Sequence, residues 1–155
     1  MADINPAALD YAVSNSRSRQ WDLFLHTFAS EFSREAAPDE LRGLMRRLGA
    51  SMAGSLLFDA GDSIPGFEAA ANRHWSAMQW GWCQLSELAD GLLIEHFAAP
   101  LAAGFGESSL VWSSALLEGV YAEWLKSLGS PASLSLAPYG EADASGRVLR
   151  FRLGR

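Results

Sequence analysis

Residues 108–129 read SSLVWSSALLEGVYAEWLKSLG, and we expect the rest of the chain to be organised around this stretch. It is long enough for about six helical turns at about 3.6 residues each. Its large apolar residues recur at helical spacing along one face: Leu110, Leu117, Val120, Tyr121, Trp124, Leu125 and Leu128. Gly106 and Ser108 are typical of a helix start, and Gly129 before Pro131 is typical of a helix end. The pattern predicts one long helix with a buried face.

The adjoining face of this helix carries small residues around one carboxylate. Ala115, Gly119 and Ala122 surround Glu118. A glycine inside a helix costs about 1 kcal/mol relative to alanine, so we expect another backbone, from this chain or a neighbouring copy, to approach Gly119 closely. Glu118 is the best single candidate for acid–base chemistry, but the sequence places no second acid with it. A solvated or intersubunit Glu118 is therefore favoured.

The composition indicates one globular domain. The chain has 155 residues, of which 49% are hydrophobic and 19% charged, so it can bury a core of its own. A net charge of −6 argues against nucleic acid as a partner, because phosphate binding relies on a basic field. No apolar run reaches the roughly 20 residues of a membrane span, and no signal peptide is visible. With a single cysteine, Cys83, these features favour the cytoplasm.

The N-terminal region reads differently from the remainder. Residues 6–13 could form a short helix, and residues 14–18 read as a polar linker. We interpret residues 1–18 as a flexible N-terminal arm and residues 19–155 as a single domain. The alternative is that the arm packs on another subunit, and the residues that would make this contact are Ile4, Leu9, Tyr11 and Val13.

Three helices are expected before the first strand. Residues 19–35 carry an aromatic stripe at helical spacing, which we interpret as core rather than as a ligand site: Trp21, Phe24, Leu25, Phe28 and Phe32. A second helix over residues 38–57 would bury Leu41, Leu44, Met45, Leu48 and Met52. Its other side would be solvated, and it carries Arg42, Arg46 and Arg47. The third helix is shorter and covers residues 67–78.

Two hairpins complete the predicted fold. Residues 79–88 alternate in the manner of a strand, Asp90-Gly91 is a strong turn signal, and residues 92–98 return as the partner strand. Residues 132–137 and 147–153 predict the second hairpin. The sequence therefore predicts an α+β domain, with N-terminal helices and the long helix packed on one face of a four-stranded antiparallel sheet.

Chemistry-bearing motifs are scarce. His26, His74 and His96 are far apart, which makes a zinc site unlikely and leaves haem binding through a lone histidine as an alternative. No catalytic residue, cofactor or metal is predicted. Four tryptophans lie on helical apolar faces and are interpreted as core: Trp21, Trp75, Trp112 and Trp124. Trp80 and Trp82, expected on one strand face, are more open to a carbohydrate-stacking role.

Besides the helical spacing of its apolar residues, the long helix carries a sequence motif. Its Trp112-x-x-x-Leu116-Leu117-Glu118-Gly119-Val120-Tyr121-x-x-Trp124 pattern resembles the signature helix of the bacterial cellulose synthase operon protein D family. Two further segments agree with this family's plan, Phe24-Leu25-His26-Thr27-Phe28 and Trp80-Gly81-Trp82. The resemblance extends over residues 20–153.

The resemblance implies a non-enzymatic accessory protein of bacterial cellulose biosynthesis and export. Such a protein would form a cylindrical homo-octamer built from dimers, with passages that guide glucan chains, and would order synthase complexes at the cytoplasmic side of the inner membrane. Its partners would be the cellulose synthase complex and other operon proteins. We therefore expect Ala115, Glu118, Gly119 and Ala122 at a subunit contact.

Two other classes of protein stay open from the sequence. One is a small-molecule or haem-sensing domain that uses His74 or His96. The other is a hydrolase that uses Glu118.

Overall fold

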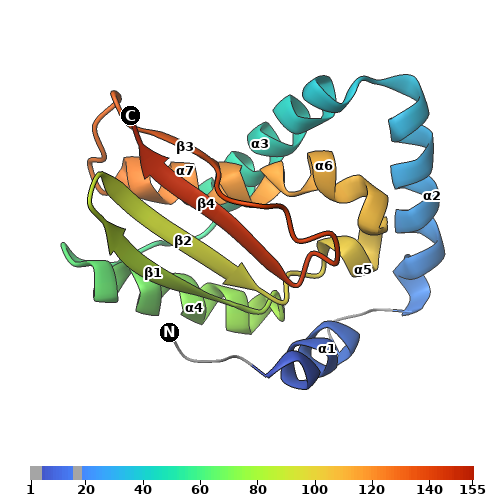
Figure 1. Ribbon diagram of the computed structural model, residues 1–155, viewed down its shortest axis with the longest axis horizontal. Helices are drawn as coiled ribbons and strands as arrows, with labels where there is room; N and C mark the ends of the chain where they lie inside the picture. The colour runs from blue at the N-terminus through green and yellow to red at the C-terminus, as the bar shows by residue number, and fades with distance from the viewer. Residues whose placement is uncertain (1–4, 16–18) are drawn as a thin grey trace.

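The computed structural model describes residues 5–15 and 19–155, in which a sheet forms one layer and most helices pack behind it (Figure 1). The helices are α1 (Pro6–Asn15), α2 (Arg19–Glu35), α3 (Pro38–Gly54), α4 (Ile64–Met78), α5 (Leu101–Phe105), α6 (Leu110–Ser113) and α7 (Ala115–Ser127), with a 3-10 turn, η1, at Glu107–Ser109. The strands are β1 (Trp82–Leu88), β2 (Gly91–Phe97), β3 (Ser135–Pro138) and β4 (Val148–Gly154). None of the helices in these two ranges is long and apolar enough to cross a membrane.

The sheet confirms the α+β prediction. Its strand order is β1-β2-β4-β3 and every neighbouring pair is antiparallel, so the two predicted hairpins join through β2 and β4. The turn of the first hairpin consists of Ala89 and Asp90, one residue earlier than the predicted Asp90-Gly91, and Gly91 begins β2 opposite Leu88. The first strand begins only at Trp82, because Gln79 ends α4 in the left-handed conformation.

The two faces of the sheet have different partners, because successive strand residues point to opposite faces. Ile94 and Phe151 face the helices and belong to the main core, with α7 behind them. Trp82 and Phe97 lie on the other face and stack with ring centroids 5.6 Å apart. Trp80 and Trp82 therefore do not share a strand face, since Trp80 precedes the strand and stacks on Trp75.

Both edges of the sheet are protected against pairing with another strand. At the β1 edge, the Asn72 side chain accepts from the Cys83 amide at 2.7 Å and donates to its carbonyl at 2.9 Å. Glu68 of the same helix accepts from the Leu85 amide at 2.8 Å. The opposite edge, β3, has only four residues and ends in Pro138. Short, proline-bearing or side-chain-capped edges resist edge-to-edge association.

The long helix predicted for residues 108–129 is interrupted. The chain forms η1, α6 and α7 instead, with a break at Ser114. At the break, the Ser114 amide donates to the Leu110 carbonyl across a long 3.4 Å. In η1, the Ser109 hydroxyl donates to the Gly106 carbonyl at 2.6 Å. The helix also ends before Leu128, which is 42% exposed rather than buried.

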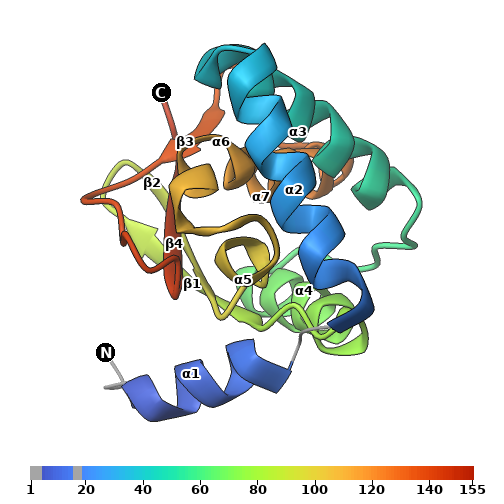
Figure 2. The same cartoon turned by 90° about the vertical axis from the view of Figure 1, so that its right-hand side faces the viewer.

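The aromatic stripe of α2 is core only in part: Phe28 and Phe32 are half-buried and Phe32 packs against the main core, but the first turns of the stripe are exposed, contrary to the prediction. Trp21 is 52% exposed and Phe24 56% exposed, because α2 lies at the end of the molecule, outside α3 and α5 (Figure 2). Only one edge of the stripe is covered, beside the buried Ala29. On α3, Leu48 was predicted to be buried and is 46% exposed.

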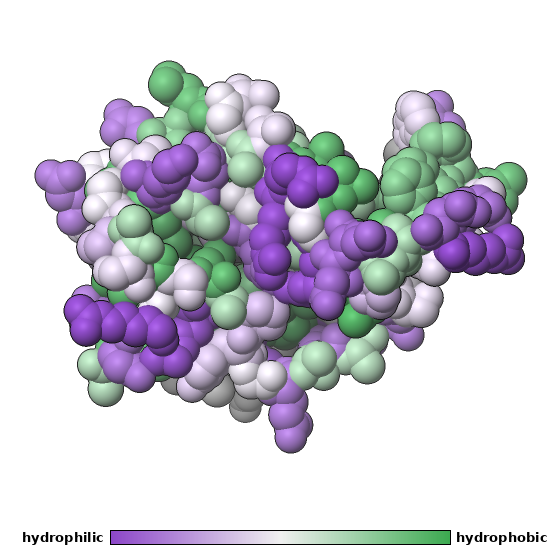
Figure 3. Space-filling view, turned by 90° about the horizontal axis from the view of Figure 1, so that it is seen from above, coloured by the Kyte–Doolittle hydropathy of each residue, from purple (hydrophilic) through white to green (hydrophobic). Residues whose placement is uncertain are grey.

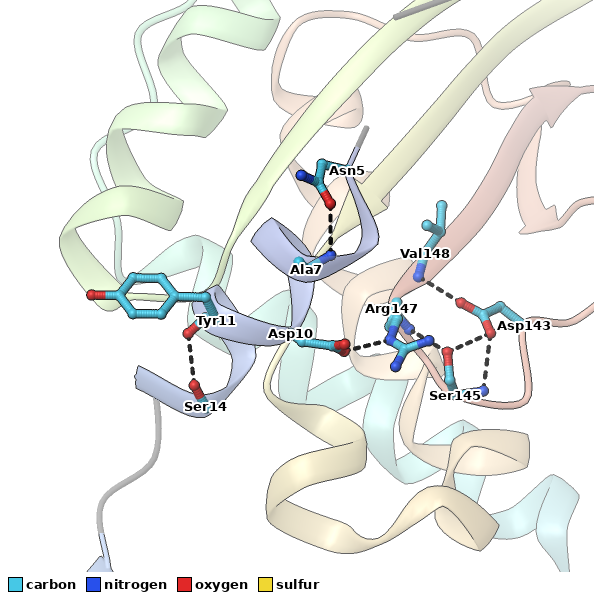
Figure 4. Close-up of polar contacts among 9 residues, drawn as sticks. All are labelled: Asn5, Ala7, Asp10, Tyr11, Ser14, Asp143, Ser145, Arg147 and Val148. Atoms are coloured by element: carbon cyan, nitrogen blue, oxygen red, sulfur yellow. Dashed lines mark hydrogen bonds and ion pairs between the residues drawn. The ribbon is translucent and has the colours of Figure 1, made fainter. Parts of the chain in front are cut away.

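The N-terminal segment forms the short helix that was predicted. In α1, Leu9 is buried against Phe97 on the outer face of the sheet, and Asp10 accepts from Arg147 at 2.7 Å (Figure 4). Tyr11 is exposed. Ile4 and the predicted linker at residues 16–18 lie outside the described residues, and the flexible-arm assignment of residues 1–18 stays a prediction.

The third helix starts earlier than predicted, at Ile64 rather than Phe67. The Ser63 hydroxyl accepts from the Gly66 amide at 3.0 Å and caps the first turn.

Candidate functional site

The close backbone approach predicted at Gly119 occurs within the chain. Helix α7 crosses α3 so tightly that a Cβ on Gly119 would lie 2.8 Å from the Arg46 carbonyl carbon. The contact is reciprocal, because a Cβ on Gly49 would lie 2.9 Å from the Val120 amide nitrogen. Gly119 of α7 faces the backbone of α3, and Gly49 of α3 faces the backbone of α7, so the two helices can approach closely. The crossing therefore depends on two positions without side chains.

Glu118 lies at this crossing and is bound by two arginines of α3. One carboxylate oxygen accepts from Arg42, and the other accepts from Arg46 Nε at 2.8 Å. Glu118 is only 1% exposed, so it is not solvated as one interpretation had it. The expectation of a solvated arginine face on α3 is also wrong for Arg42, whose side chain is 16% exposed. With both oxygens engaged, Glu118 is a structural ion-pair partner in this geometry.

The four residues expected at a subunit contact fall into two groups. Ala115, Glu118 and Gly119 are buried in the single chain, whereas Ala122 is exposed. The small residues thus have an explanation inside the chain, where α3 packs on α7. The assignment of all four to a subunit contact stays a prediction.

A second buried polar group joins the sheet to α7. His96 Nε2 lies 2.7 Å from the Trp80 carbonyl, so this nitrogen carries the proton and donates. His96 Nδ1 then accepts from the Tyr121 hydroxyl at 2.6 Å. Burial lowers the pKa of His96 to about 4, although the hydrogen bond to the Trp80 carbonyl raises this pKa in part. The neutral ring is thus a fixed hydrogen-bonding link in the core.

We expect the His96 link to make stability depend on pH. The folded-state pKa of about 4 lies below the ordinary value of 6.5, so the unfolded chain binds more protons between these values. The free energy of unfolding should be highest above pH 6.5 and should fall by up to about 3 kcal/mol as the pH drops towards 4. Urea unfolding at several pH values measures this. A His96→Gln variant should lose most of the slope, whereas His26→Gln should keep it; equal slopes in both variants would contradict the assignment.

The remaining titratable candidates are also engaged. His26 Nε2 donates to the Ala103 carbonyl at 3.1 Å, and His74 Nε2 donates to the Leu57 carbonyl at 3.0 Å. Burial raises the pKa of the Cys83 thiol to about 12, so the thiol is protonated and unreactive at neutral pH. Within residues 5–15 and 19–155, no three His, Cys, Asp or Glu side chains gather as metal ligands would.

The aromatic face of α2 is accessible in part, at Trp21 and Phe24. Its rings form a continuous ladder with successive centroid separations of 5.6, 6.0 and 4.2 Å, made by Trp21, Phe24, Phe28 and Phe32. Two hollows separate α2 from α3 and its neighbours, one of about 350 Å³ beside Trp21 and Met52 and one of about 450 Å³ beside Phe32 and Leu44. From above, hydrophobic residues lie on the side of α2 that faces the rest of the molecule (Figure 3). We use the name α2–α3 groove for the surface that the aromatic ladder and these two hollows form together.

Sequence reasoning found the ladder but assigned it to the core. It missed the Glu118 pairing entirely, because Arg42 lies 76 residues away in the chain. The His96 link likewise has no spacing signature. An unusual density of aromatics on one helix was the only signal for the α2–α3 groove.

The geometry describes an α+β protein whose accessible feature is an aromatic helix face beside a groove. A family model for the D subunits of cellulose synthase matches residues 7–152, from α1 to β4, and the chain therefore belongs to this family. A relative from Komagataeibacter xylinus named "Cellulose synthase operon protein D" is 29% identical over 109 residues, which cover 69% of this chain and 70% of the relative. A relative of the same name from Komagataeibacter sucrofermentans is 28% identical with the same coverage. The resemblance seen in the α7 motif is confirmed.

Proposed function

We propose that the protein is a non-catalytic scaffold of bacterial cellulose biosynthesis and export that works as a homo-oligomer. The assembly is an octamer built from dimers, which spaces synthase complexes and aligns the glucan chains that leave them. It lies beside the inner-membrane synthase on the cytoplasmic side and contacts other proteins of the operon. The family membership supports the link to cellulose, and the exposed ladder of α2 supports self-association.

The ladder carries this proposal because it is costly to leave in water. Burying a phenylalanine or similar side chain gains about 1.5–3 kcal/mol, and large exposed apolar patches mark interaction sites. Trp21 and Phe24 are each more than half exposed, and Leu23 is 80% exposed on the same helix. We therefore infer that another copy of the chain covers α2.

The rest of the molecule supports the same location for the contact. Asn72, Glu68 and Pro138 protect the two sheet edges, so strand addition is disfavoured as a means of association. The α2–α3 groove, in contrast, has the form that accepts an amphipathic helix through anchors spaced three and four residues apart. Helix α2 presents this spacing itself at Trp21, Phe24 and Phe28. A second copy of α2 thus fits the groove in a two-fold arrangement.

The test of this contact is the solution mass of matched variants. A Trp21→Ser, Phe24→Ser double variant should lower the mass measured by light scattering from a multimer to a monomer or a smaller oligomer, with unchanged far-UV circular dichroism. The control is Leu57→Ser, which removes a side chain that is 91% exposed and lies outside α2. It should leave the mass unchanged. A double variant with the parent mass would exclude the ladder as the contact.

A further inference from the structure

A third hollow shares no lining residue with the α2–α3 groove. Its volume is about 590 Å³, within the range of about 300–1,000 Å³ typical of small-ligand sites. Helix α6 forms one wall and the connection between β3 and β4 forms the other. Leu110, Leu149 and Phe151 supply apolar lining. We call it the α6 cavity.

The rim of the α6 cavity is held in place by one carboxylate. Asp143 accepts from the Ser145 amide at 2.9 Å and hydroxyl at 2.6 Å, and from the Val148 amide at 2.9 Å (Figure 4). Burial opposes ionisation, but these hydrogen bonds outweigh it and the pKa of Asp143 is lowered. Arg147, next to this turn, is tied to Asp10 of α1. The cavity wall is therefore preformed.

The charges of the cavity select against anions. Its two guanidinium groups are paired with carboxylates: Arg42 shares Glu118 with Arg46, and Arg150 pairs with Glu95 at 3.0 Å. Among the residues that the structure describes, Glu107 and Glu141 line the cavity with no ion-pair partner. The uncompensated charge is negative, so a neutral ligand with hydroxyl donors fits and a phosphate or uronate does not.

One aromatic ring is presented without a partner at the mouth of the cavity. Tyr139 is fixed through its backbone, whose amide donates to the Arg150 carbonyl at 2.9 Å, while its side chain is 41% exposed. Within residues 5–15 and 19–155, its hydroxyl makes no hydrogen bond. An amphipathic ring with a free hydroxyl beside carboxylate acceptors suits the apolar face and the hydroxyl rim of a pyranose.

We propose that the α6 cavity binds a short segment of neutral β-1,4-glucan, with Tyr139 against a sugar face and Glu107 and Glu141 accepting from its hydroxyl groups. The proposal rests on the proposed role in cellulose assembly and adds a specific contact site to it. The site would hold the polymer while the α2–α3 groove holds the assembly together. The two surfaces are separate, so each can be removed without the other.

Calorimetric titration with cellopentaose tests the site. The parent protein should bind the sugar, and Tyr139→Ala should raise Kd by about fivefold, since an aromatic contact of this kind contributes on the order of 1 kcal/mol. The matched control is Tyr11→Ala, which removes an exposed tyrosine of α1 that lies outside the cavity. It should leave Kd unchanged. A carboxymethylated cello-oligosaccharide should bind more weakly than cellopentaose.

Three results would overturn the proposal: no cellopentaose binding by the parent protein, an unchanged Kd in Tyr139→Ala, or equal binding of the carboxymethylated sugar. Loss of binding in Trp21→Ala with retention in Tyr139→Ala would also overturn it and place the sugar in the α2–α3 groove. Solution mass on the same samples separates the two proposals. An oligomer that binds no sugar contradicts the cavity alone, whereas a monomer whose binding depends on Tyr139 supports the cavity and contradicts the scaffold.

Discussion

A Gly119→Ala variant is expected to lose about 3 kcal/mol or more of its free energy of unfolding. The new Cβ would lie 2.8 Å from the carbonyl carbon and 2.9 Å from the Cα of Arg46, and closer still to the carbonyl oxygen. Overpacking a core commonly costs about 1–3 kcal/mol, and here the obstacle is helix backbone that cannot rotate away. A larger side chain in Gly119→Leu should prevent folding. Urea unfolding followed by circular dichroism measures both.

The chain offers a control for this prediction within α3. A Cβ on Gly43 would meet only the end of the Arg47 side chain, at 3.6 Å. Gly43→Ala should therefore be neutral or stabilising by up to about 1 kcal/mol, as expected for a glycine in an open helix position. Stabilities of the Gly43→Ala and Gly119→Ala variants within about 0.5 kcal/mol of each other would contradict a tight α3–α7 crossing.

Glu118→Ala should be comparably damaging, with a loss of about 3–5 kcal/mol, because it leaves a buried arginine without its counter-charge. Arg42 carries most of this effect, since its side chain is 16% exposed, whereas that of Arg46 is 50% exposed and can turn to water. Thermal and urea unfolding give the difference.

The comparison for Glu118 is another carboxylate of α7. Glu123 lies 4.0 Å from the exposed Lys126 in a surface pair, so Glu123→Ala should cost no more than about 1 kcal/mol. If Glu118→Ala were as mild as Glu123→Ala, the buried ion pairs would not hold α3 to α7.

Local patterns predicted the elements of the fold well. The alternation after Trp80 and the Asp90-Gly91 turn signal gave the first hairpin, and the interior Gly119 gave a close helix crossing. These features are encoded over a few residues, so one sequence is enough to read them. The antiparallel sheet followed from the two hairpins.

The tertiary partners of a helix face could not be predicted from local sequence patterns. Periodicity shows that α2 has an apolar face but not whether the chain itself covers it, and so Trp21 and Phe24 were assigned to the core. The partners of Glu118 and His96 are likewise set by tertiary contacts between distant segments. The break at Ser114 is not marked in the apolar period, which continues across it.

The measurement that tests the central claim most directly is the solution mass of the unmodified chain across a range of concentrations. One chain has a mass of 16.8 kDa. If a second copy covers the α2 ladder, light scattering should give a discrete multiple of this mass, and the proposed octamer corresponds to about eight chains. A mass of 16.8 kDa at every concentration, with Trp21 and Phe24 left in water, would contradict the account.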